Sequence, residues 1–363
     1  MTAGVEDAPI GNAWAHYDWD SASRQACQHC HTATGAANFM DAAADEFATY
    51  DPTANDFSHL LDGQNELLYC WGCHSSVDSG ALRATGAIPL DYTVDGAFPS
   101  LTAPDGNSAA CLSCHSGRGN ADSLLNGRTT ATPDAITDYK IGGTSTHYFA
   151  AGATIYQVET KVGYTFGLPA ASYANPSYFA HNQVGCAECH MTSDNSHSFA
   201  VVAKDETTGA ITQLLAANCV ECHSGAHGAA LVNEDGPLGT AAAAAAFLEE
   251  EAEGYHQALE VFGAALAAAG TTPDSGYPYF VVTDPIATPT LAEAVQNEGH
   301  SGAMHNYSYL HHEPGAYAHN RLYAKRLIYD SLDWLDNAVM DQSVVVDAVA
   351  YPHAATWLGA TRP

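Results

Sequence analysis

The chain has 363 residues, 46% of them hydrophobic, which is enough for one large domain or two ordinary ones and excludes a chain disordered by its composition. Asp and Glu number 41 against 11 Lys and Arg, a formal net charge of −30, so nucleic acid and anionic membranes are not expected as partners. No stretch reaches the roughly 18–20 apolar residues that a membrane-spanning helix needs, so no transmembrane segment is expected.

Three segments follow one another along the chain. Residues 1–140 hold three copies of a C-x-x-C-H pattern in sequence rich in Gly, Pro, Ser, Thr, Asn and Asp, which predicts loops. Residues 141–230 hold two more copies, with short strands predicted within 154–166 and a hairpin whose turn is at Thr208–Gly209. Residues 231–363 hold no cysteine and predict helices at about 240–269 and 317–340, joined by a loop rich in Pro and Tyr.

The repeated pattern uses all ten cysteines and reads CQHCH, CWGCH, CLSCH, CAECH and CVECH. C-x-x-C-H is the attachment signature of c-type haem, in which both thiols form thioethers and the histidine binds the iron. Structural zinc joins two C-x-x-C pairs, and five pairs leave one over. Disulfides give no reason for a histidine after each second cysteine, and a thioredoxin-like motif is a single pair. The pattern therefore predicts five covalent haem c groups.

The residues of these five sites can be read directly from the pattern. The predicted attachment cysteines are Cys27, Cys30, Cys70, Cys73, Cys111, Cys114, Cys186, Cys189, Cys219 and Cys222. The predicted proximal iron ligands are His31, His74, His115, His190 and His223. Haem attachment takes place outside the cytoplasm, so we expect an exported protein. The opening "MTAGVEDAPIGNAW" carries no export signal, and we expect a leader to have been removed from this numbering.

Fourteen further histidines compete for the sixth position of five irons. The candidates stand near an attachment site or beside aromatic or small residues, and they are His16, His59, His147, His181, His197 and His319. One of the six is surplus, or it orients another ligand. The histidines not expected to bind iron are His29, His227, His256 and His353. With histidine so plentiful and only five methionines, we expect bis-histidine ligation and low reduction potentials.

The expected fold is that of a multihaem cytochrome c, loop-rich with short helices and few strands, and with a core built around the haems. The helical C-terminal third, residues 231–363, is expected to carry no haem, to pack on the haem region and to contribute one distal histidine. The three segments 1–140, 141–230 and 231–363 would then form one continuous haem-packed unit.

Four stretches carry a family likeness, namely "AWAHYDWDSASRQACQHCHTATG", "NDFSHLLDGQNELLYCWGCHSS", "STHYFAAGATIY" and "HHEPGAYAHNRLYAKRLIYDSLDWLD". They resemble a family of secreted multihaem c-type cytochromes of metal-reducing and sediment bacteria. The resemblance implies bis-histidine haems, a place outside the cell or on its outer surface, and electron transfer to other redox proteins or extracellular acceptors. Some such cytochromes polymerise into conductive filaments in which a neighbouring subunit donates one distal histidine, and His16 is best placed here for that role.

Two functions are weighed. An electron conduit needs several low-potential haems at short separation and no substrate pocket. A multihaem reductase of a small nitrogen or sulfur oxyanion needs an iron with an open position, which some of these enzymes mark with C-x-x-C-K. No lysine replaces histidine in any of the five motifs, so we expect an electron carrier rather than an enzyme.

Overall fold

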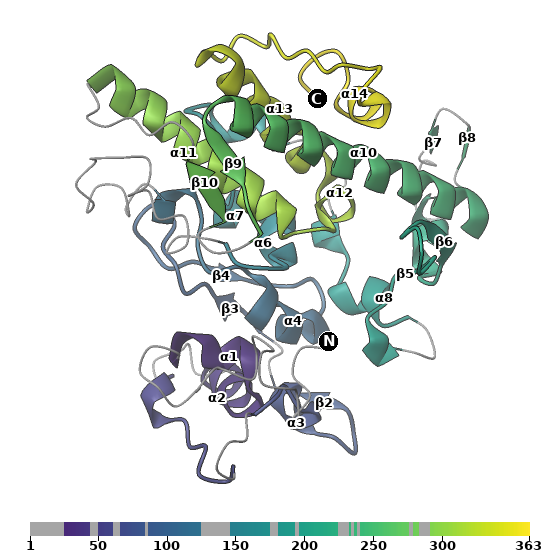
Figure 1. Ribbon diagram of the computed structural model, residues 1–363. Coiled ribbons are helices and arrows are strands. Elements are labelled where there is room, and N and C mark those ends of the chain that lie inside the picture. Colours follow the sequence, from purple (N-terminus) through teal and green to yellow (C-terminus); the bar gives the residue numbers. More distant parts are fainter. Residues whose placement is uncertain are drawn as a thin grey trace.

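The computed structural model describes residues 25–43, 50–60, 66–83, 86–124, 146–174, 181–192, 196–223, 232–233, 236–237, 240–275, 279–282 and 291–363. Within these residues the chain is mostly helical, and its strands pair only in two-stranded antiparallel ladders. Helices α1 to α3 lie at one end of the molecule, α10 to α14 at the other, and α4 and α8 between them (Figure 1). This confirms a helix-rich fold with few short strands.

The N-terminal part consists of short elements joined by loops. They are η2 (Gln25–Cys27), α1 (Gln28–His31), α2 (Ala33–Ala43), η3 (Pro52–Ala54), α3 (Cys70–Cys73), β1 (His74–Ser76), β2 (Ala81–Leu82), β3 (Ile88–Pro89), β4 (Ser100–Leu101), η4 (Gly106–Ser108) and α4 (Ala109–His115). β1 pairs with β2 and β3 with β4. Side chains from α2, β3, β4 and α4 form an apolar cluster that includes Met40, Ile88, Leu101 and Leu112.

The middle part continues with elements of the same short kind. They are α6 (Ala151–Ile155), α7 (Gln157–Thr160), η7 (Ala170–Ser172), η8 (His181–Gln183), α8 (Cys186–His190), η9 (Ser196–Ser198), β5 (Val202–Lys204), β6 (Ile211–Leu214), α9 (Asn218–His223), β7 (Val232–Asn233) and β8 (Gly236–Pro237). The predicted hairpin is confirmed as β5 and β6. Its turn is held by Asp205, which accepts from the backbone N–H groups of Thr207 and Thr208, and by Gly209 at φ +76°.

The strands predicted within 154–166 are wrong, because this stretch forms α6 and α7. Gly152 lies so close to α4 that a Cβ atom there would be 2.6 Å from the Leu112 side chain and 3.0 Å from the His115 carbonyl. The hydroxyls of Thr154 and Thr160 donate to the backbone carbonyls of Ala150 and Ala153. Close packing on α4 and these local bonds outweigh the β-propensity of the sequence.

The C-terminal part contains the long helices. Its elements are α10 (Ala241–Ala268), β9 (Thr271–Pro273), β10 (Phe280–Val282), α11 (Leu291–His311), α12 (Ala316–His319), α13 (Arg321–Asn337) and α14 (Pro352–Leu358). The helices predicted at about 240–269 and 317–340 are confirmed as α10 and as α12 with α13. Thr240 caps α10, its hydroxyl accepting from the backbone N–H of Ala243 at 3.1 Å.

Helix α11 was not predicted, since its sequence was expected to be a loop. Its low hydrophobicity hides the helical period, and tertiary contacts stabilise it instead. Asn306 bonds through its side chain to both backbone groups of Tyr164 and to the hydroxyl of Ser331. Residues 352–358 form α14, with Pro352 in the first turn.

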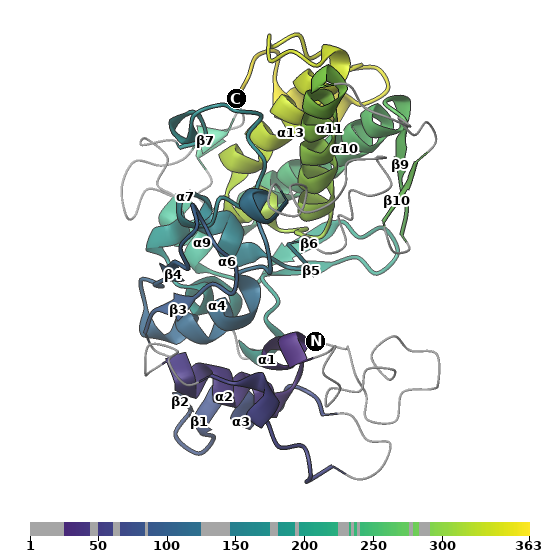
Figure 2. The same cartoon turned by 90° about the vertical axis from the view of Figure 1, so that its left-hand side faces the viewer.

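The largest apolar cluster lies among α10, α11, α13 and α14, and it includes Tyr255, Phe262, Leu266, Tyr309 and Leu327. These helices pack together at the end of the molecule away from α1 to α3 (Figure 2). The N-terminal and C-terminal apolar clusters both consist of protein side chains. The expected core built around haems therefore stays a prediction.

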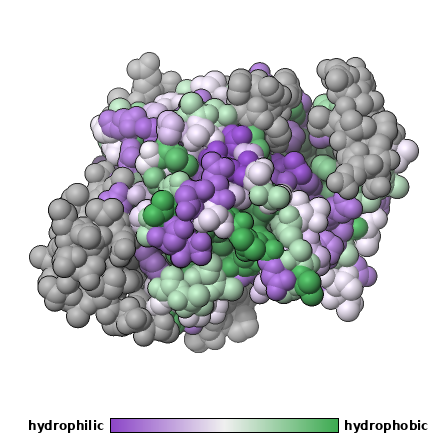
Figure 3. All heavy atoms as spheres, turned by 90° about the horizontal axis from the view of Figure 1, so that it is seen from above, coloured by the Kyte–Doolittle hydropathy of each residue, from purple (hydrophilic) through white to green (hydrophobic). Residues whose placement is uncertain are grey.

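The outer face of this end mixes hydrophilic and hydrophobic residues (Figure 3). No helix in the described ranges is long and apolar enough to cross a membrane. The longest of them, α10, carries four glutamates between positions 249 and 253.

Candidate haem centres

Each C-x-x-C-H sequence includes a short helical turn: α1, α3, α4, α8 or α9, with Cys27 ending η2 just before α1 and His74 beginning β1 just after α3. In each turn the two cysteines are separated by two residues, which places both sulfur atoms on one turn of chain. All ten cysteines lie within the described residues, and no disulfide joins any two of them. The turns therefore present paired thiols followed by a histidine, which is the donor set that c-type haem requires.

Four of the turns contact one another in series. The Cys30 thiol donates to the carbonyl of Ser113 at 3.9 Å and the Cys114 thiol donates to the carbonyl of His29 at 3.7 Å, which joins α1 to α4. The backbone N–H of Ala187 in α8 donates to the hydroxyl of Ser108, directly before α4, at 3.4 Å, and the Cys111 and Cys186 thiols lie close enough to interact. Asn218 reaches from α9 to α8, with its Nδ2 atom 3.6 Å from the Cys189 sulfur. The attachment turns thus follow one another in the order α1, α4, α8 and α9 through the molecule.

The fifth turn, α3, joins the series beside α1. It packs on the first residues of α2, where a Cβ atom at Gly72 would be 3.1 Å from the Cα atom of Ala33. The backbone N–H of Ala33 donates to the carbonyl of Leu67 at 3.0 Å. The Cys73 thiol is also close enough to Cys114 for the two to interact electrostatically.

Three predicted proximal histidines face a predicted distal histidine. The ring centroids are 6.0 Å apart for His31 and His147, 6.0 Å for His74 and His197, and 6.1 Å for His190 and His319. A metal–imidazole bond is about 2 Å long, so two rings on opposite sides of one iron have centroids about 6 Å apart. The spacing of all three pairs fits two axial ligands of one haem.

The other predicted ligands are placed as follows. Burial foremost, and then the charges of His319 and His223, lower the pKa of His181, so both histidines lie within electrostatic reach of it. His16 lies outside the described residues. His59 is not brought to a proximal histidine in the described part of the chain; its Nε2 atom is 3.0 Å from the buried carboxylate of Glu66.

The histidines differ in which ring nitrogen is already bonded. Nδ1 faces a carbonyl or carboxylate in His74 (Gly80 O, 3.0 Å), His115 (Phe149 O, 2.8 Å), His181 (Ala318 O, 2.6 Å), His190 (Phe199 O, 2.9 Å) and His319 (Glu313 Oε1, 2.7 Å). A bond at Nδ1 fixes the tautomer and orients the ring so that Nε2 can bind a metal. By contrast, His300 and His305 use Nε2 for their own bonds, to Thr271 and to the Val162 carbonyl.

Burial favours the neutral form of four of the predicted ligand rings. Burial foremost, with the positive charge of Arg118, lowers the pKa of both His31 and His147 to about 4. Burial also lowers the pKa of His190 and His223. His319 behaves differently: burial acts to lower its pKa, but the charge and hydrogen bond of Glu313 outweigh that effect and raise it. A neutral imidazole is the form that binds a metal, so His31, His147, His190 and His223 are prepared for ligation.

A short repeat links neighbouring centres and was missed in the sequence. It reads H-x-F-A, at 147–150 and again at 197–200. In both copies the histidine faces one proximal ring, while the phenylalanine carbonyl accepts from Nδ1 of another, His115 or His190. Phe149 and Phe199 both have left-handed backbone conformations, at φ +55° and +56°. The shared sequence was the available signal, but its meaning depends on contacts between distant segments.

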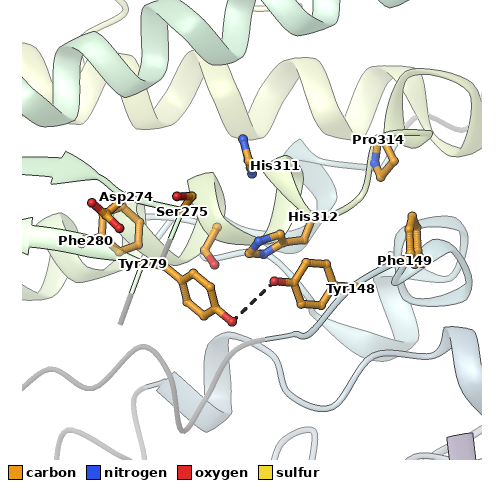
Figure 4. A pocket seen from close by; sticks show the side chains of 10 residues that line it. Tyr148, Phe149, Asp274, Ser275, Tyr279, Phe280, His311, His312 and Pro314 are labelled. Carbon is orange, nitrogen blue, oxygen red and sulfur yellow. Dashed lines mark hydrogen bonds between the residues drawn. The ribbon is translucent and has the colours of Figure 1, made fainter. Parts of the chain in front are cut away.

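A pocket of about 360 Å³ borders the first of these repeats (Figure 4). Its wall includes Tyr148, Phe149, Tyr279 and His312, with the tyrosine hydroxyls 3.5 Å apart and the Tyr148 and His312 ring centroids 4.2 Å apart. Its described lining contains Asp274 but no Lys or Arg. Such a wall suits a planar group better than a small oxyanion, which needs cationic donors.

Comparison with known proteins agrees with this geometry. Residues 1–83 match the family described as C-type polyheme cytochrome domain 2. The chain is 37% identical over 422 aligned positions to the C-type polyheme cytochrome OmcB of Geobacter sulfurreducens, and 36% identical over 425 to OmcC of the same organism. These alignments cover 100% of the chain but only 52% and 51% of the relatives, so it spans about half their length. No solved structure matches it. Over its whole length the chain is therefore similar to multihaem c-type cytochromes, and its five attachment turns agree with that similarity.

Proposed function

We propose that the protein carries electrons along five covalently bound haem c groups and has no catalytic reaction of its own. The observation that carries this proposal is the series of contacts among α1, α4, α8 and α9, with α3 beside α1. Electrons pass between haems only over short distances, so a conduit needs neighbouring attachment sites. The protein holds the spacing and tunes the potentials, while the haems supply the redox chemistry.

The ligand pairs proposed for four irons are His31 with His147, His74 with His197, His190 with His319, and His223 with His181. The ring spacings of the first three pairs and the proximity of the fourth support them. For the iron at His115, the remaining candidates are His16 and His59. His16 is the better one, because the Nε2 atom of His59 already bonds to Glu66.

The proposed location is outside the cell or on its outer surface, with other redox proteins or extracellular acceptors as partners. The covalent haem attachment sites and the similarity to the Geobacter polyheme cytochromes support this. A homopolymeric filament, with His16 ligating an iron in the next subunit, is the proposed form of long-range transfer.

Intact-mass and spectroscopic measurements test the proposal. Mass spectrometry of the purified chain should show five haem additions and no free thiol. The oxidised protein should give only low-spin visible and EPR signals. Four or fewer haems would contradict the count. A high-spin haem that binds nitrite would favour the reductase instead.

A further inference from the structure

The distal histidine of one proposed centre differs from four other proposed ligands in what its Nδ1 atom bonds. In His74, His115, His181 and His190 the partner of Nδ1 is a neutral backbone carbonyl. In His319 the partner is the carboxylate of Glu313, at 2.7 Å. A carboxylate attracts the Nδ1 proton more strongly than a carbonyl does, so it makes the imidazole a stronger electron donor through Nε2.

Glu313 is held so that its charge acts mainly on this ring. The Glu313 side chain is only 2% exposed. Its Oε1 atom faces His319, and its Oε2 atom is buried without a hydrogen-bond partner among the described residues. With little water nearby, the interaction between the carboxylate and the imidazole is screened far less than at the surface.

The surrounding backbone keeps Glu313 and His319 in place. The Tyr255 hydroxyl, itself fully buried, donates to the backbone carbonyls of Leu310 and Glu313, at 2.7 and 3.1 Å. A Cβ atom at Gly315 would lie 2.7 Å from Cε1 of His319 and 3.3 Å from Oε1 of Glu313. Only glycine leaves room at this position for the ring and the carboxylate to meet.

We propose that Glu313 is a positioning residue that makes the haem attached at Cys186 and Cys189 the lowest in potential of the five. A stronger donor stabilises ferric iron relative to ferrous iron, so an electron resides less readily at this centre. Because α8 lies between α4 and α9 in the series of attachment turns, the centre is an internal step of the path. This inference rests on the proposed function and on His319 as the ligand opposite His190.

The test is a potentiometric titration of the haem-loaded full-length protein carrying Glu313→Gln. Glutamine keeps an oxygen for the Nδ1–H group but removes the charge. We expect the lowest of five midpoint potentials to rise, with the other four unchanged, five haems retained and the EPR signal of one low-spin haem altered. Glu253→Gln is the matched control, because Glu253 faces His353 at 3.4 Å on the exposed surface and touches no proposed ligand.

If all five potentials stay at their wild-type values in Glu313→Gln, or if Glu253→Gln shifts the same one equally, the inference is wrong. Should Glu313→Gln fail to fold, Glu313→Asp retains the charge on a shorter side chain, and we expect a smaller rise in the same potential. A wild-type titration curve in the aspartate variant would overturn the inference too. The haem count and spin state of the wild type test the proposed function separately.

Discussion

At the scale of single residues, the bonded ring nitrogen distinguishes several proposed ligands from His300 and His305, which bond through Nε2. His74, His190 and His319 bond through Nδ1, and each faces another imidazole. On α10, His256 packs against Tyr255 of the same helix and against Tyr317 of α12. Histidines in similarly polar stretches of sequence can therefore differ in whether they bind iron, according to which ring nitrogen remains available to the metal.

Replacing His147 or His319 by alanine should convert one haem in five to high spin. Each variant removes one axial ligand from a single iron, while the proximal histidine and both thioethers remain. Visible and EPR spectra of the oxidised variants measure the change. His256→Ala and His353→Ala serve as controls and should stay fully low-spin. A low-spin spectrum in both ligand variants would show that the proposed pairs are wrong.

At the scale of elements, short turns orient the rings and long helices support them. The H-x-F-A turns depend on left-handed residues, which most side chains disfavour. The helices α10, α13 and α14 are joined by buried polar contacts, such as the Trp357 Nε1–H that donates to Glu251 at 2.7 Å. The H-x-F-A turns hold a disfavoured backbone conformation, and the long helices hold buried charged groups. Substitutions can test each of these features.

The turn at Phe199 can be tested by comparing two substitutions. Phe199→Gly favours the left-handed backbone and should keep the carbonyl on Nδ1 of His190. Phe199→Val opposes that backbone by about 1–2 kcal/mol and should displace the carbonyl. Potentiometric titration should therefore show a changed midpoint potential for the haem of His190 in the valine variant, and a smaller change in the glycine variant. Equal shifts in the two variants would contradict an effect through backbone conformation.

Lys325 on α13 provides a test of stability against pH. Burial foremost, helped by Arg321 and opposed by Glu251, lowers the pKa of Lys325 from 10.5 to about 8. Its ammonium lies 4.8 Å from the centroid of the Trp357 ring. A folded-state pKa below the unfolded one means that the buried charge destabilises the protein fully below pH 8, and that this effect disappears as the pH rises to 10.5.

We expect Lys325→Met to be more stable than the wild type at pH 7, by roughly 2 kcal/mol. The shift corresponds to about 3 kcal/mol, and the lost contact with Trp357 offsets about 1 kcal/mol. Guanidinium unfolding at pH 7 and pH 9.5 measures the difference in free energy of unfolding, which should shrink at the higher pH. A difference that does not change with pH would mean that the charge on Lys325 is not its cause.

At the scale of the whole molecule, the attachment turns run from the N-terminal end towards the helical C-terminal part, and α12 supplies a proposed ligand to the α8 centre. The C-terminal helices supply most of the residues of the largest described apolar cluster, so this part of the chain has a side-chain core as well as a proposed haem ligand. A net charge of −30 opposes association between copies unless a specific bond or screening cations offset it.

If copies join through a shared axial histidine, His16→Ala should disperse the polymer into subunits that each show one altered haem. His16 lies outside the described residues, and the expectation rests on its place beside Trp14, Tyr17 and Trp19, which supply apolar area for docking. Electron microscopy and light scattering of wild type and variant provide the measurement. A wild type that is a monodisperse monomer at high salt would rule out the filament.

The sequence by itself determined what local patterns encode. The five C-x-x-C-H turns indicated the family, the turn at Thr208–Gly209 predicted the hairpin, and apolar periodicity predicted α10 and α13. These signals are readable because each depends on neighbours within a few residues.

Only the tertiary structure decided how distant segments meet. It paired His31 with His147 and His190 with His319, formed α11 from a sequence of weak periodicity, and brought Glu313 to His319 in a site that admits only glycine at position 315. Six candidate histidines had equivalent claims in the sequence, because ligand choice depends on ring orientation and on which nitrogen is free. Both are set by packing between segments that the chain order keeps far apart.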